Sequence, residues 1–326
     1  MRPDVQAWFA HRTSTSADHD RHRLADRKGA TTVSIVLPAR NEAATVGAIV
    51  ERLLEELVER VHLVDEVLVV DSGSDDATSE VARAAGATVV RQDQVLPELG
   101  DRPGKGEALW KSLHVTTGDV VAFVDADLCE FDAQFAVGLL GPLLDDPRVE
   151  FVKGFYDRPL HTGGEVLPAG GGRVTEILAR PLLDMHLPEL AGIVQPLAGE
   201  YAGRRTLLER LPFVSGYGVE IAMLVDVLHE VGIDAIAQVD LGLRRHRNSG
   251  DAALGRMACQ VYLALLSRLE RYGHVVVHDP PTPLITQFAR VEDEFVPTTS
   301  CVAVSERPPM ARLAVSSDPG RATGRP

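Results

Sequence analysis

The sequence predicts an α/β protein built on a mainly parallel, Rossmann-like sheet flanked by helices. Between residues 32 and 124, short apolar runs alternate with segments whose apolar residues recur at helical spacing. Strands that alternate with helices pair in parallel through right-handed crossovers. Clusters of polar residues follow directly after the apolar runs, and sheets of this type bind ligands at those strand ends. The pattern therefore predicts a nucleotide-binding fold with its site along one sheet edge.

The predicted elements alternate along this region. We expect strands at residues 33–38, 67–70, 88–90 and 120–124. We expect helices from near Asn41 to Leu57 and at residues 77–85 and 107–115. Gly86 is a typical residue to end the second of these helices.

Outside this region the pattern is weaker. Residues 1–30 are polar, rich in His, Arg and Asp, and lack a sustained hydrophobic period, so we expect a loosely ordered arm. Residues 254–269 carry apolar residues at helical intervals and predict a helix that packs in the core or at a dimer contact. Residues 278–326 contain many prolines, which favours an irregular tail.

The composition excludes several classes of protein. With 326 residues, of which 45% are hydrophobic and 25% charged, the chain can bury one substantial core or two smaller ones. The net charge of −14 argues against nucleic acid and anionic membranes as partners, because the overall field repels polyanions. No run approaches the roughly 20 apolar residues of a spanning helix, so no membrane insertion is expected. Cys129, Cys259 and Cys301 are far apart and odd in number, which favours a cytoplasmic protein over one with a disulfide framework or a zinc cluster.

Two polar clusters follow the first two strands. Residues 38–42 lie where a strand gives way to a helix, and such a turn can hold a nucleotide, although Asn41 can equally act as a simple helix cap. Residues 71–76 offer carboxylates, hydroxyls and a glycine to a base or a ribose. A calcium-binding loop is the alternative there, but the spacing and the distal glutamate of an EF-hand loop are missing.

Asp125 and Asp127 follow the strand at residues 120–124. Alternate residues of an extended strand share a face, so both carboxylates are expected to approach one hard divalent cation that also binds a diphosphate. A metal at this position would stabilise the charge of a leaving diphosphate without proton transfer. Acidic pairs are also common at solvated turns, but the place of this pair after a βαβαβ pattern favours the functional interpretation.

Two further clusters combine glycines with a basic residue. Lys105 lies between two glycines at the start of a helix, where backbone N–H groups can meet phosphate oxygens. The spacing is not that of a P-loop, and a solvated surface lysine is equally compatible with it. Residues 170–172 precede Arg173 and Thr175, which predicts an anion-binding cradle with a guanidinium suited to phosphate or carboxylate. A glycine loop with a solvated arginine is the alternative.

Two more candidates lie downstream. His246 belongs to the basic run at residues 244–247, which is a solvated face or an anion contact unless the imidazole ligates a divalent metal. Glu220 follows Tyr217 and opens an apolar stretch, where a glutamate in the first helical turn is favoured by the helix dipole.

Together these motifs resemble the glucosyl-3-phosphoglycerate synthases of actinobacteria, over about residues 32–270. The likeness is carried by residues 36–42, 71–74, 102–110, 125–128, 170–176, 195–201, 216–221 and 244–248. The resemblance implies a GT-A glycosyltransferase fold and a retaining enzyme that moves glucose from UDP-glucose to 3-phosphoglycerate. It also implies a homodimer that uses Mg²⁺, with Mn²⁺ or Co²⁺ as substitutes. The product would be a precursor of glucosylglycerate and of methylglucose lipopolysaccharides.

The resemblance further implies a role for each part of the chain. After the arm, residues 31–127 would bind the nucleotide sugar, residues 128–277 the acceptor and a second subunit, and residues 278–326 would form the tail. Donor contacts would come from Pro38, Ala39, Glu42, Ser72, Lys105, Asp125 and Tyr217. Acceptor contacts would come from Gly172, Arg173, Thr175 and Asn248, and metal ligands from Asp127 and His246. Arg40 stands where relatives often carry an apolar residue, which predicts a different fit around the base.

The catalytic residues implied by the resemblance are Leu197, Glu220 and Asp127. Retention needs either a carboxylate nucleophile or attack by the acceptor on the face from which the diphosphate leaves, and the residues alone do not distinguish these routes. The resemblance favours the same-face route. The backbone carbonyl of Leu197 would then lie near the anomeric carbon, Glu220 would orient the sugar hydroxyls, and the departing phosphate would help to take the acceptor proton.

Three rival functions share part of this pattern. A mannosyl-3-phosphoglycerate synthase that uses GDP-mannose would share much of the pattern. A nucleotidyltransferase would also use an acidic pair and a metal, but its glycine-rich signature after the first strand is missing. A catalytically silent sugar-nucleotide-binding protein is disfavoured by the intact acidic pair and acceptor loop.

Overall fold

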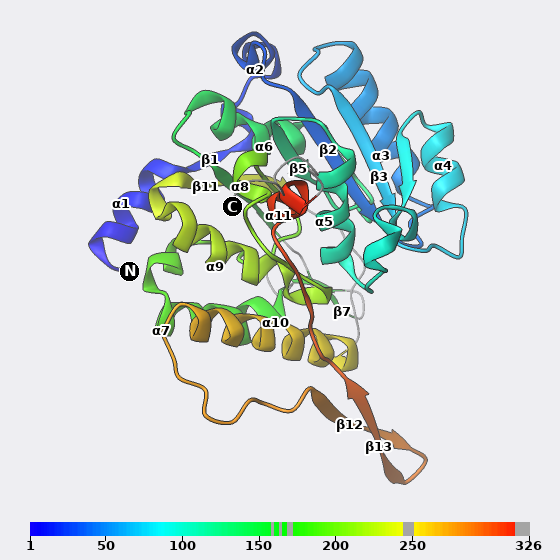
Figure 1. Ribbon diagram of the computed structural model, residues 1–326, viewed down its shortest axis with the longest axis vertical. Helices are drawn as coiled ribbons and strands as arrows, with labels where there is room; N and C mark the ends of the chain where they lie inside the picture. The colour runs from blue at the N-terminus through cyan, green and yellow to red at the C-terminus, as the bar shows by residue number, and fades with distance from the viewer. Residues whose placement is uncertain (158–159, 163–164, 168–171, 244–250, 317–326) are drawn as a thin grey trace, which may run out of the picture.

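The chain folds around an eight-stranded sheet, seen in a computed structural model that describes residues 1–157, 160–162, 165–167, 172–243 and 251–316 (Figure 1). The strand order is β1-β11-β6-β9-β5-β2-β3-β4. Neighbouring strands are parallel except at β9, which runs antiparallel to both β5 and β6. The strands are β1 (Thr13–Thr15), β2 (Val33–Ala39), β3 (Glu66–Asp71), β4 (Thr88–Arg91), β5 (Val120–Phe123), β6 (Phe151–Asp157), β9 (Tyr201–Arg204) and β11 (Ile236–Leu243). The mainly parallel sheet predicted from the sequence is confirmed.

Helices flank this sheet, and those predicted at residues 77–85, 107–115 and 254–269 are confirmed within a few residues. Their bounds are α3 (Val46–Leu53), α4 (Thr78–Ala84), α5 (Lys105–Val115), α6 (Gln134–Asp145), α7 (Arg180–His186), α8 (Arg205–Leu208), α9 (Val219–Val231) and α10 (Asp251–Arg271). A π-helical segment, η2 (Leu54–Glu59), continues α3, and a second one, η5 (Thr175–Ala179), precedes α7.

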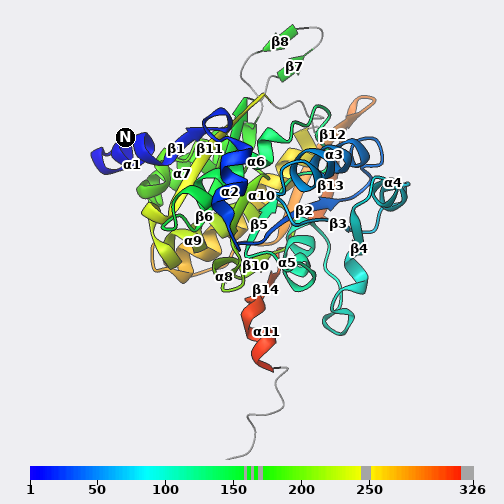
Figure 2. The same ribbon diagram turned by 90° about the horizontal axis from the view of Figure 1, so that it is seen from above.

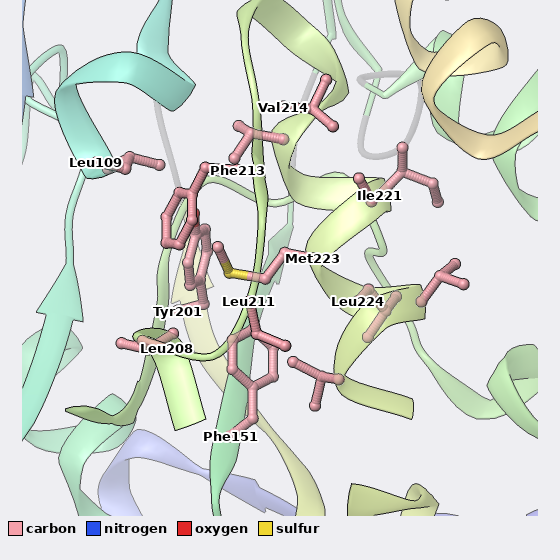
Figure 3. Packing of buried hydrophobic residues seen from close by; sticks show 14 of the residues in the cluster. Leu109, Phe151, Tyr201, Leu208, Leu211, Phe213, Val214, Ile221, Met223 and Leu224 are labelled. Atoms are coloured by element: carbon pink, nitrogen blue, oxygen red, sulfur yellow. The ribbon is translucent and has the colours of Figure 1, made fainter. Parts of the chain in front are cut away.

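Side-chain alternation along the strands divides the core into two clusters. In β2, Val36 faces the cluster that includes α5 and α9, whereas Leu37 faces the cluster that includes α3 and α6. Figure 3 shows part of the first cluster, in which Phe151 of β6, Tyr201 of β9 and Met223 of α9 come together. Burial on both faces explains why the central strands read as continuous apolar runs in the sequence.

The helix that was expected to begin near Asn41 begins instead at Val46. Asn41 has a φ of 60°, in the left-handed region, and Thr45 is the residue at the N-cap position of the helix. Its N–H donates to Ser74 Oγ (3.0 Å) and its Oδ1 accepts from the N–H of Asp75 (2.8 Å). Asn41 therefore joins two loops, and the alternative of a simple helix cap is not observed.

The N-terminal segment is ordered, so the expectation of a loose arm over residues 1–30 is also wrong. It forms α1 (Pro3–Arg12), β1, a 3₁₀ turn η1 (Ser16–Asp18) and α2 (Arg21–Lys28). Trp8 and Leu24 are buried, and the Trp8 indole Nε1 donates to the carbonyls of Ile233 (2.9 Å) and Ile236 (3.0 Å). Each short helix contributes only one or two buried residues, which is too few for a visible hydrophobic period.

The C-terminal part is regular over most of its described length, which corrects the expected irregular tail. β12 (Leu284–Val291) and β13 (Glu294–Cys301) form a hairpin that projects from the body in Figure 1. β14 (Glu306–Arg307) pairs with β10 (Phe213–Val214), and α11 (Met310–Ser316) follows. The Trp110 indole donates to the carbonyl of Pro308 (2.8 Å), which holds this end of the chain on α5. Residues 317–326 lie outside the described part.

A second hairpin, β7 (Leu160–Thr162) with β8 (Glu165–Leu167), projects from another side of the body, as Figure 2 shows. Across the ranges that the structure describes, none of the helices is both long and apolar enough to cross a membrane.

We predict that Trp8→Ala lowers the free energy of unfolding by about 3–5 kcal/mol, because it empties a packed site and leaves two carbonyls without their donor. Urea titration followed by circular dichroism measures this loss. Phe9→Ala is the matched control, since the neighbouring Phe9 is 36% exposed, and it should cost less than about 1 kcal/mol. Equal small effects would mean that α1 contributes nothing to the core.

Candidate active site

The polar clusters that follow β2, β3 and β5 meet at the carboxyl ends of these strands. Thr45 Oγ1, in the loop after β2, donates to the carbonyl of Ala126 after β5 (2.6 Å). The N–H of Glu42 donates to Thr78 Oγ1 beyond β3 (2.8 Å). Together with the bonds of Asn41 to the loop after β3, these contacts bring the first three predicted clusters into one site. The sequence prediction of a ligand edge is therefore consistent with the observed geometry.

Gln92 connects the loop after β3 to the loop before α5. Its Oε1 accepts from Ser72 Oγ (2.8 Å), and its Nε2 donates to the carbonyl of Arg102 (3.0 Å). Gln92 is almost fully buried, and the sequence analysis did not select it. The sequence feature that could have identified Gln92 is its place just after a predicted strand of the sheet.

Asp71 fastens the loop that follows β3. It is buried and accepts from Ser79 Oγ and from the N–H of Ser74 (2.8 Å). Burial raises the pKa of Asp71, but these hydrogen bonds outweigh it and hold the pKa below its ordinary value. Over the described residues, no three His, Cys, Asp or Glu side chains are grouped so that they could hold a metal ion, which gives the alternative of a calcium loop no support.

Lys105, the first residue of α5, forms the electrostatic centre of the site. Its Nζ lies 2.5 Å from Asp125 Oδ1 and 3.2 Å from Glu220 Oε1, and it donates to the carbonyl of Gly199 (3.3 Å). Burial lowers the pKa of Lys105, but the two carboxylates outweigh it and raise the pKa well above its ordinary value. Lys105 is therefore a charged, paired residue and not the solvated surface lysine that the sequence left open.

Asp125 and Asp127 differ in surroundings, which corrects the sequence argument for a shared strand face. β5 ends at Phe123, and residues 126 and 127 lie in a turn, so the alternation of an extended strand does not extend to this pair. The Asp125 carboxylate is engaged by Lys105, whereas Asp127 lies half-buried two residues further on.

Two glycines allow the loops to approach one another this closely. A Cβ at Gly199 would lie 2.3 Å from Asp125 Oδ2 and 2.5 Å from Lys105 Nζ, so a side chain there would displace the ion pair. Gly104, at the N-terminus of α5, has a φ of 104°, and a Cβ on it would lie 2.7 Å from the backbone of Gly216. The lysine loop thus lies against the loop that carries Tyr217.

Glu220 and Tyr217 lie at the N-terminal end of α9, as the sequence predicted. Glu220 is in the first turn and buried, with its carboxylate on Lys105. Tyr217 lies in the preceding 3₁₀ turn η7 (Gly216–Gly218), where its side chain is 56% exposed and its N–H donates to Gln260 Oε1 of α10 (3.1 Å). Tyr217 is therefore exposed and available to a ligand, while Glu220 is held in place.

The remaining donor candidates lie where β2 ends. Pro38 and Ala39 are the last two residues of β2, with Ala39 buried, and Glu42 lies in the loop that follows. The backbone of Ala39 accepts from the N–H of Ser72 (2.9 Å), which continues the pairing of β2 with β3 to the edge of the site.

The acceptor candidates are described only in part. Gly172 has a φ of 84°, and its carbonyl accepts from the N–H of Glu176 (3.1 Å), so it lies at the start of a helical turn. Arg173 follows in that turn, and Thr175 is buried as the first residue of η5. Both η5 and η7 pack against α10. The turn at residues 172–175, called the arginine turn below, and the turn that carries Tyr217 therefore lie near the same helix. Residues 170 and 171, as well as His246 and Asn248, lie outside the described residues.

Leu197 lies in a loop that is fastened at several points. The loop runs from Gln195 to Glu200 and leads into β9. Gln195 exchanges hydrogen bonds with the backbone of Tyr156, and the carbonyl of Glu200 accepts from the N–H of Gly154 (2.9 Å). Leu197 itself is half-buried. The sequence analysis missed Lys153, whose Nζ donates to the carbonyl of Ala198 in this loop (2.5 Å). A lysine inside an apolar strand was the signal for it.

Comparison with known proteins links this site to a family of enzymes. Residues 34–167 match the model of glycosyl transferase family 2. The glucosyl-3-phosphoglycerate synthase of Mycolicibacterium smegmatis is 51% identical over 286 residues, which cover 88% of this chain and 91% of that protein.

Solved structures show the same likeness. Glucosyl-3-phosphoglycerate synthase from Mycobacterium tuberculosis, in complex with Mn²⁺, UDP-glucose and phosphoglyceric acid, is 45% identical, with a TM-score of 0.78 over 89% of this chain and 94% of that one. A structure of that protein with Mg²⁺ and UDP is 43% identical, with a TM-score of 0.81 over 92% and 98% of the two chains. The mannosyl-3-phosphoglycerate synthase of Rubrobacter xylanophilus is 40% identical, with a TM-score of 0.87 over 95% and 98% of the two chains.

We predict a measurable coupling between Lys105 and Asp125 in a double-mutant cycle of Lys105→Met and Asp125→Asn. Because the pair is largely shielded from water, its coupling should be about 1–3 kcal/mol in the free energy of unfolding, measured by urea denaturation. Arg210 and Glu230 form an ion pair of similar length (2.9 Å) whose side chains are close to half exposed, so Arg210→Met with Glu230→Gln is the matched control. Equal couplings in the two cycles would contradict the special role of the Lys105 pair.

Proposed function

The chain belongs to the glucosyl-3-phosphoglycerate synthase family, and on that basis we propose that it transfers glucose from UDP-glucose to 3-phosphoglycerate with retention of the α configuration. The observation that carries this proposal is the ion-paired centre of Lys105, Asp125 and Glu220 at the point where the predicted donor loops meet. This centre has one ammonium and two carboxylates, so a diphosphate bound beside it needs a further cation, while the carboxylates can accept hydrogen bonds from sugar hydroxyls.

We propose that the nucleotide lies along the ends of β2 and β3. Pro38, Ala39 and Ser72 border that edge, and Glu42 lies in the adjoining loop. Lys105 and Asp125 are fixed against each other before any ligand arrives, so they need little reorganisation on binding. The role of Tyr217 in donor binding is supported by its exposure beside the lysine loop.

We propose that this edge binds a hard divalent cation, because related structures contain Mg²⁺ or Mn²⁺. Such ions prefer carboxylate oxygens and are commonly shared between a protein and a substrate diphosphate. We propose Asp127 and His246 as the protein ligands, because they belong to the motifs that this chain shares with the family. When bound, the metal supplies charge neutralisation of the departing diphosphate.

We propose that 3-phosphoglycerate is held by the turn at Gly172, Arg173 and Thr175, with Asn248 as a further contact. The positive φ of Gly172 starts a helical turn, so backbone N–H groups at that end are available to an anion. The Arg173 guanidinium can bind a carboxylate or phosphate through two parallel hydrogen bonds. An acceptor that carries both groups matches this combination.

For the transfer itself, we propose attack on the face from which the diphosphate leaves. The acceptor oxygen forms its bond to the anomeric carbon as the bond from that carbon to the phosphate oxygen breaks, and the acceptor proton passes to the departing phosphate oxygen. The backbone carbonyl of Leu197 lies near the anomeric centre in this proposal, and Glu220, held by Lys105, orients the sugar hydroxyls. Catalysis then depends on positioning and on charge stabilisation.

We also propose that the chain forms a homodimer, and that the β12–β13 hairpin adds a contact outside residues 128–277, to which the resemblance assigns the second subunit. A two-stranded hairpin is at best marginally stable alone in water. This one exposes Phe288 (66%), Phe295 (67%) and Val291 (55%) to solvent away from the body of the protein (Figure 1). Exposed apolar side chains on a projecting element favour a partner surface, and a second copy of the chain is the partner that we propose.

The cytoplasmic location expected from the sequence stays a prediction.

The second candidate function is transfer of mannose from GDP-mannose to the same acceptor. Its support is the likeness to the Rubrobacter enzyme, whose TM-score of 0.87 exceeds that of either mycobacterial structure. The sequence identity favours glucose, because in the same structural comparison the glucosyl enzyme of M. tuberculosis reaches 43–45% against 40% for the mannosyl enzyme.

We predict that, with 3-phosphoglycerate and Mg²⁺, the protein consumes UDP-glucose faster than GDP-mannose and yields α-linked glucosyl-3-phosphoglycerate. Mass spectrometry identifies the product and the NMR coupling of its anomeric proton gives the configuration. Release of UDP without 3-phosphoglycerate should be far slower, which distinguishes a transferase from a nucleotidyltransferase or a silent binding protein. A β-linked product would exclude retention, and a preference for GDP-mannose would establish the second candidate.

We predict that Arg173→Ala raises the KM for 3-phosphoglycerate about 10- to 150-fold while leaving the affinity for UDP almost unchanged. The range corresponds to the loss of about 1.5–3 kcal/mol from a charge-assisted hydrogen bond. The KM of Arg173→Lys should lie between those of wild type and Arg173→Ala, because lysine keeps the charge but lacks the planar guanidinium that makes two parallel hydrogen bonds. Steady-state kinetics and calorimetric titration with UDP give the two quantities.

Asp127→Ala is the control for the Arg173 experiment, because it should change kcat instead of the acceptor KM. As a proposed metal ligand, Asp127 should affect kcat, by roughly a hundredfold or more, and leave the acceptor KM nearly unchanged. If Arg173→Ala weakens UDP instead, the arginine turn belongs to the donor side. Full turnover of the wild type in the presence of a chelator would contradict the metal requirement.

A further inference from the structure

Lys153 is a charged residue in the middle of the sheet. It lies in β6, between β11 and β9, and its side chain is 1% exposed. In β6 it shares a face with Phe151, which packs in the cluster of Figure 3. A lysine is rarely buried this completely without a specific partner, because removing an ammonium from water is costly. None of the roles described above uses it.

The partner of Lys153 is the loop that carries Leu197. Its Nζ donates to the carbonyl of Ala198 at 2.5 Å, and it lies 4.8 Å from the centre of the Tyr201 ring, whose residue is its register partner across β6 and β9. Next along the loop, the carbonyl of Gly199 accepts from Lys105. The buried ammonium of Lys153 and the partly buried ammonium of Lys105 thus hold consecutive carbonyls of one loop.

The surroundings of Lys153 are shared with the active site. Burial lowers the pKa of Lys153 to about 7, against the opposing effect of nearby carboxylates. The charged or titratable groups that face it are Glu220, Lys105, Glu200, Asp125 and Tyr201. Three of these are carboxylates, so a protonated Lys153 offsets part of their charge at the place where a diphosphate is expected.

We propose that Lys153 is a positioning residue for glycosyl transfer, which holds the peptide of Ala198 so that the preceding carbonyl, that of Leu197, points at the anomeric carbon. This inference rests on the proposed function and adds a residue to it. The Leu197 carbonyl belongs to a loop and not to a helix or strand, so its direction depends on what fastens the loop. Without the ammonium, the Ala198 carbonyl would lose its donor in a buried setting, and the loop could rotate away from the sugar.

A purely structural role predicts something different. A residue that only fills space changes the fraction of folded protein, whereas the activity of each folded molecule stays the same. A positioning residue changes kcat for folded molecules that still bind their substrates, because misplacement by about 1 Å can cost on the order of a hundredfold in rate. The value of kcat per UDP-binding site therefore distinguishes the two roles: it stays unchanged for a structural residue and falls for a positioning residue.

The test uses three variants of the full-length protein: Lys153→Met, which has similar length and no donor, Lys153→Gln, which keeps a donor without charge, and Lys153→Arg, which keeps both. We expect Lys153→Met to lower kcat about 10- to 100-fold with UDP affinity within about threefold of wild type. Lys153→Gln and Lys153→Arg should each recover part of kcat. Calorimetric titration with UDP counts the competent sites in each preparation.

The pH dependence supplies a second readout. In the wild type, kcat/KM for UDP-glucose at saturating 3-phosphoglycerate should fall as the pH rises through about 7, because Lys153 then loses its proton. Lys153→Met and Lys153→Arg should lack this decline, since one has no ionisable group and the other stays charged. A decline near pH 7 that persists unchanged in Lys153→Met contradicts the assignment.

Asp226→Asn is the control for lost stability. Asp226 is buried in α9, where it accepts from Arg268 and Tyr272 away from the Lys105 centre, so the variant should be destabilised with an unchanged kcat. A kcat per binding site of Lys153→Met that equals wild type overturns the inference. If the wild type itself transfers no sugar, the proposed function fails instead, and the two failures are distinct.

Discussion

The ion pairs of Lys105 with Asp125 and Glu220 are the interaction on which the rest of the site depends. They join the start of α5, the end of β5 and the first turn of α9, three elements that no local sequence signal connects. Partly buried charges are tolerated only when each has a partner, so the three groups constrain one another's positions. Gly199 and Gly104 lack side chains where the loops close around this centre, because a Cβ at either position would collide with it or with its neighbouring loop.

The same principle fastens the C-terminal part of the chain to the catalytic body. Arg307 donates to Glu107 through two hydrogen bonds of 2.7 and 2.6 Å, and Lys111 lies 3.3 Å from the same carboxylate. Further along, Arg268 of α10 binds Asp226 of α9. Removing one partner of a buried ion pair is typically strongly destabilising. The segment that reads as an irregular tail is therefore held on α5, the helix whose first residue is Lys105.

The antiparallel strand β9 brings an additional loop to the ligand edge of the sheet. A wholly parallel sheet would present only strand ends and the loops that follow them at the ligand edge. Because β9 runs in the opposite direction, the loop that precedes it, with Leu197, reaches the same edge as the loops that follow β2 and β5. The donor-side loops and the loop proposed to face the anomeric carbon thus meet across Lys105.

Sequence alone determined the alternation of strands and helices, the polar clusters at the strand ends and the motifs that resemble the family, because these depend on periodicity and spacing within short segments. It did not determine that Asn41 adopts a left-handed backbone, that Trp8 packs beneath the carbonyls of Ile233 and Ile236, or that Lys153 fastens the Ala198 carbonyl. Each of these is a contact between residues far apart in the chain, or a backbone conformation imposed by such a contact. Tertiary structure alone decided them, since the free energy of a buried charge or a buried indole depends on which distant groups the fold brings to it.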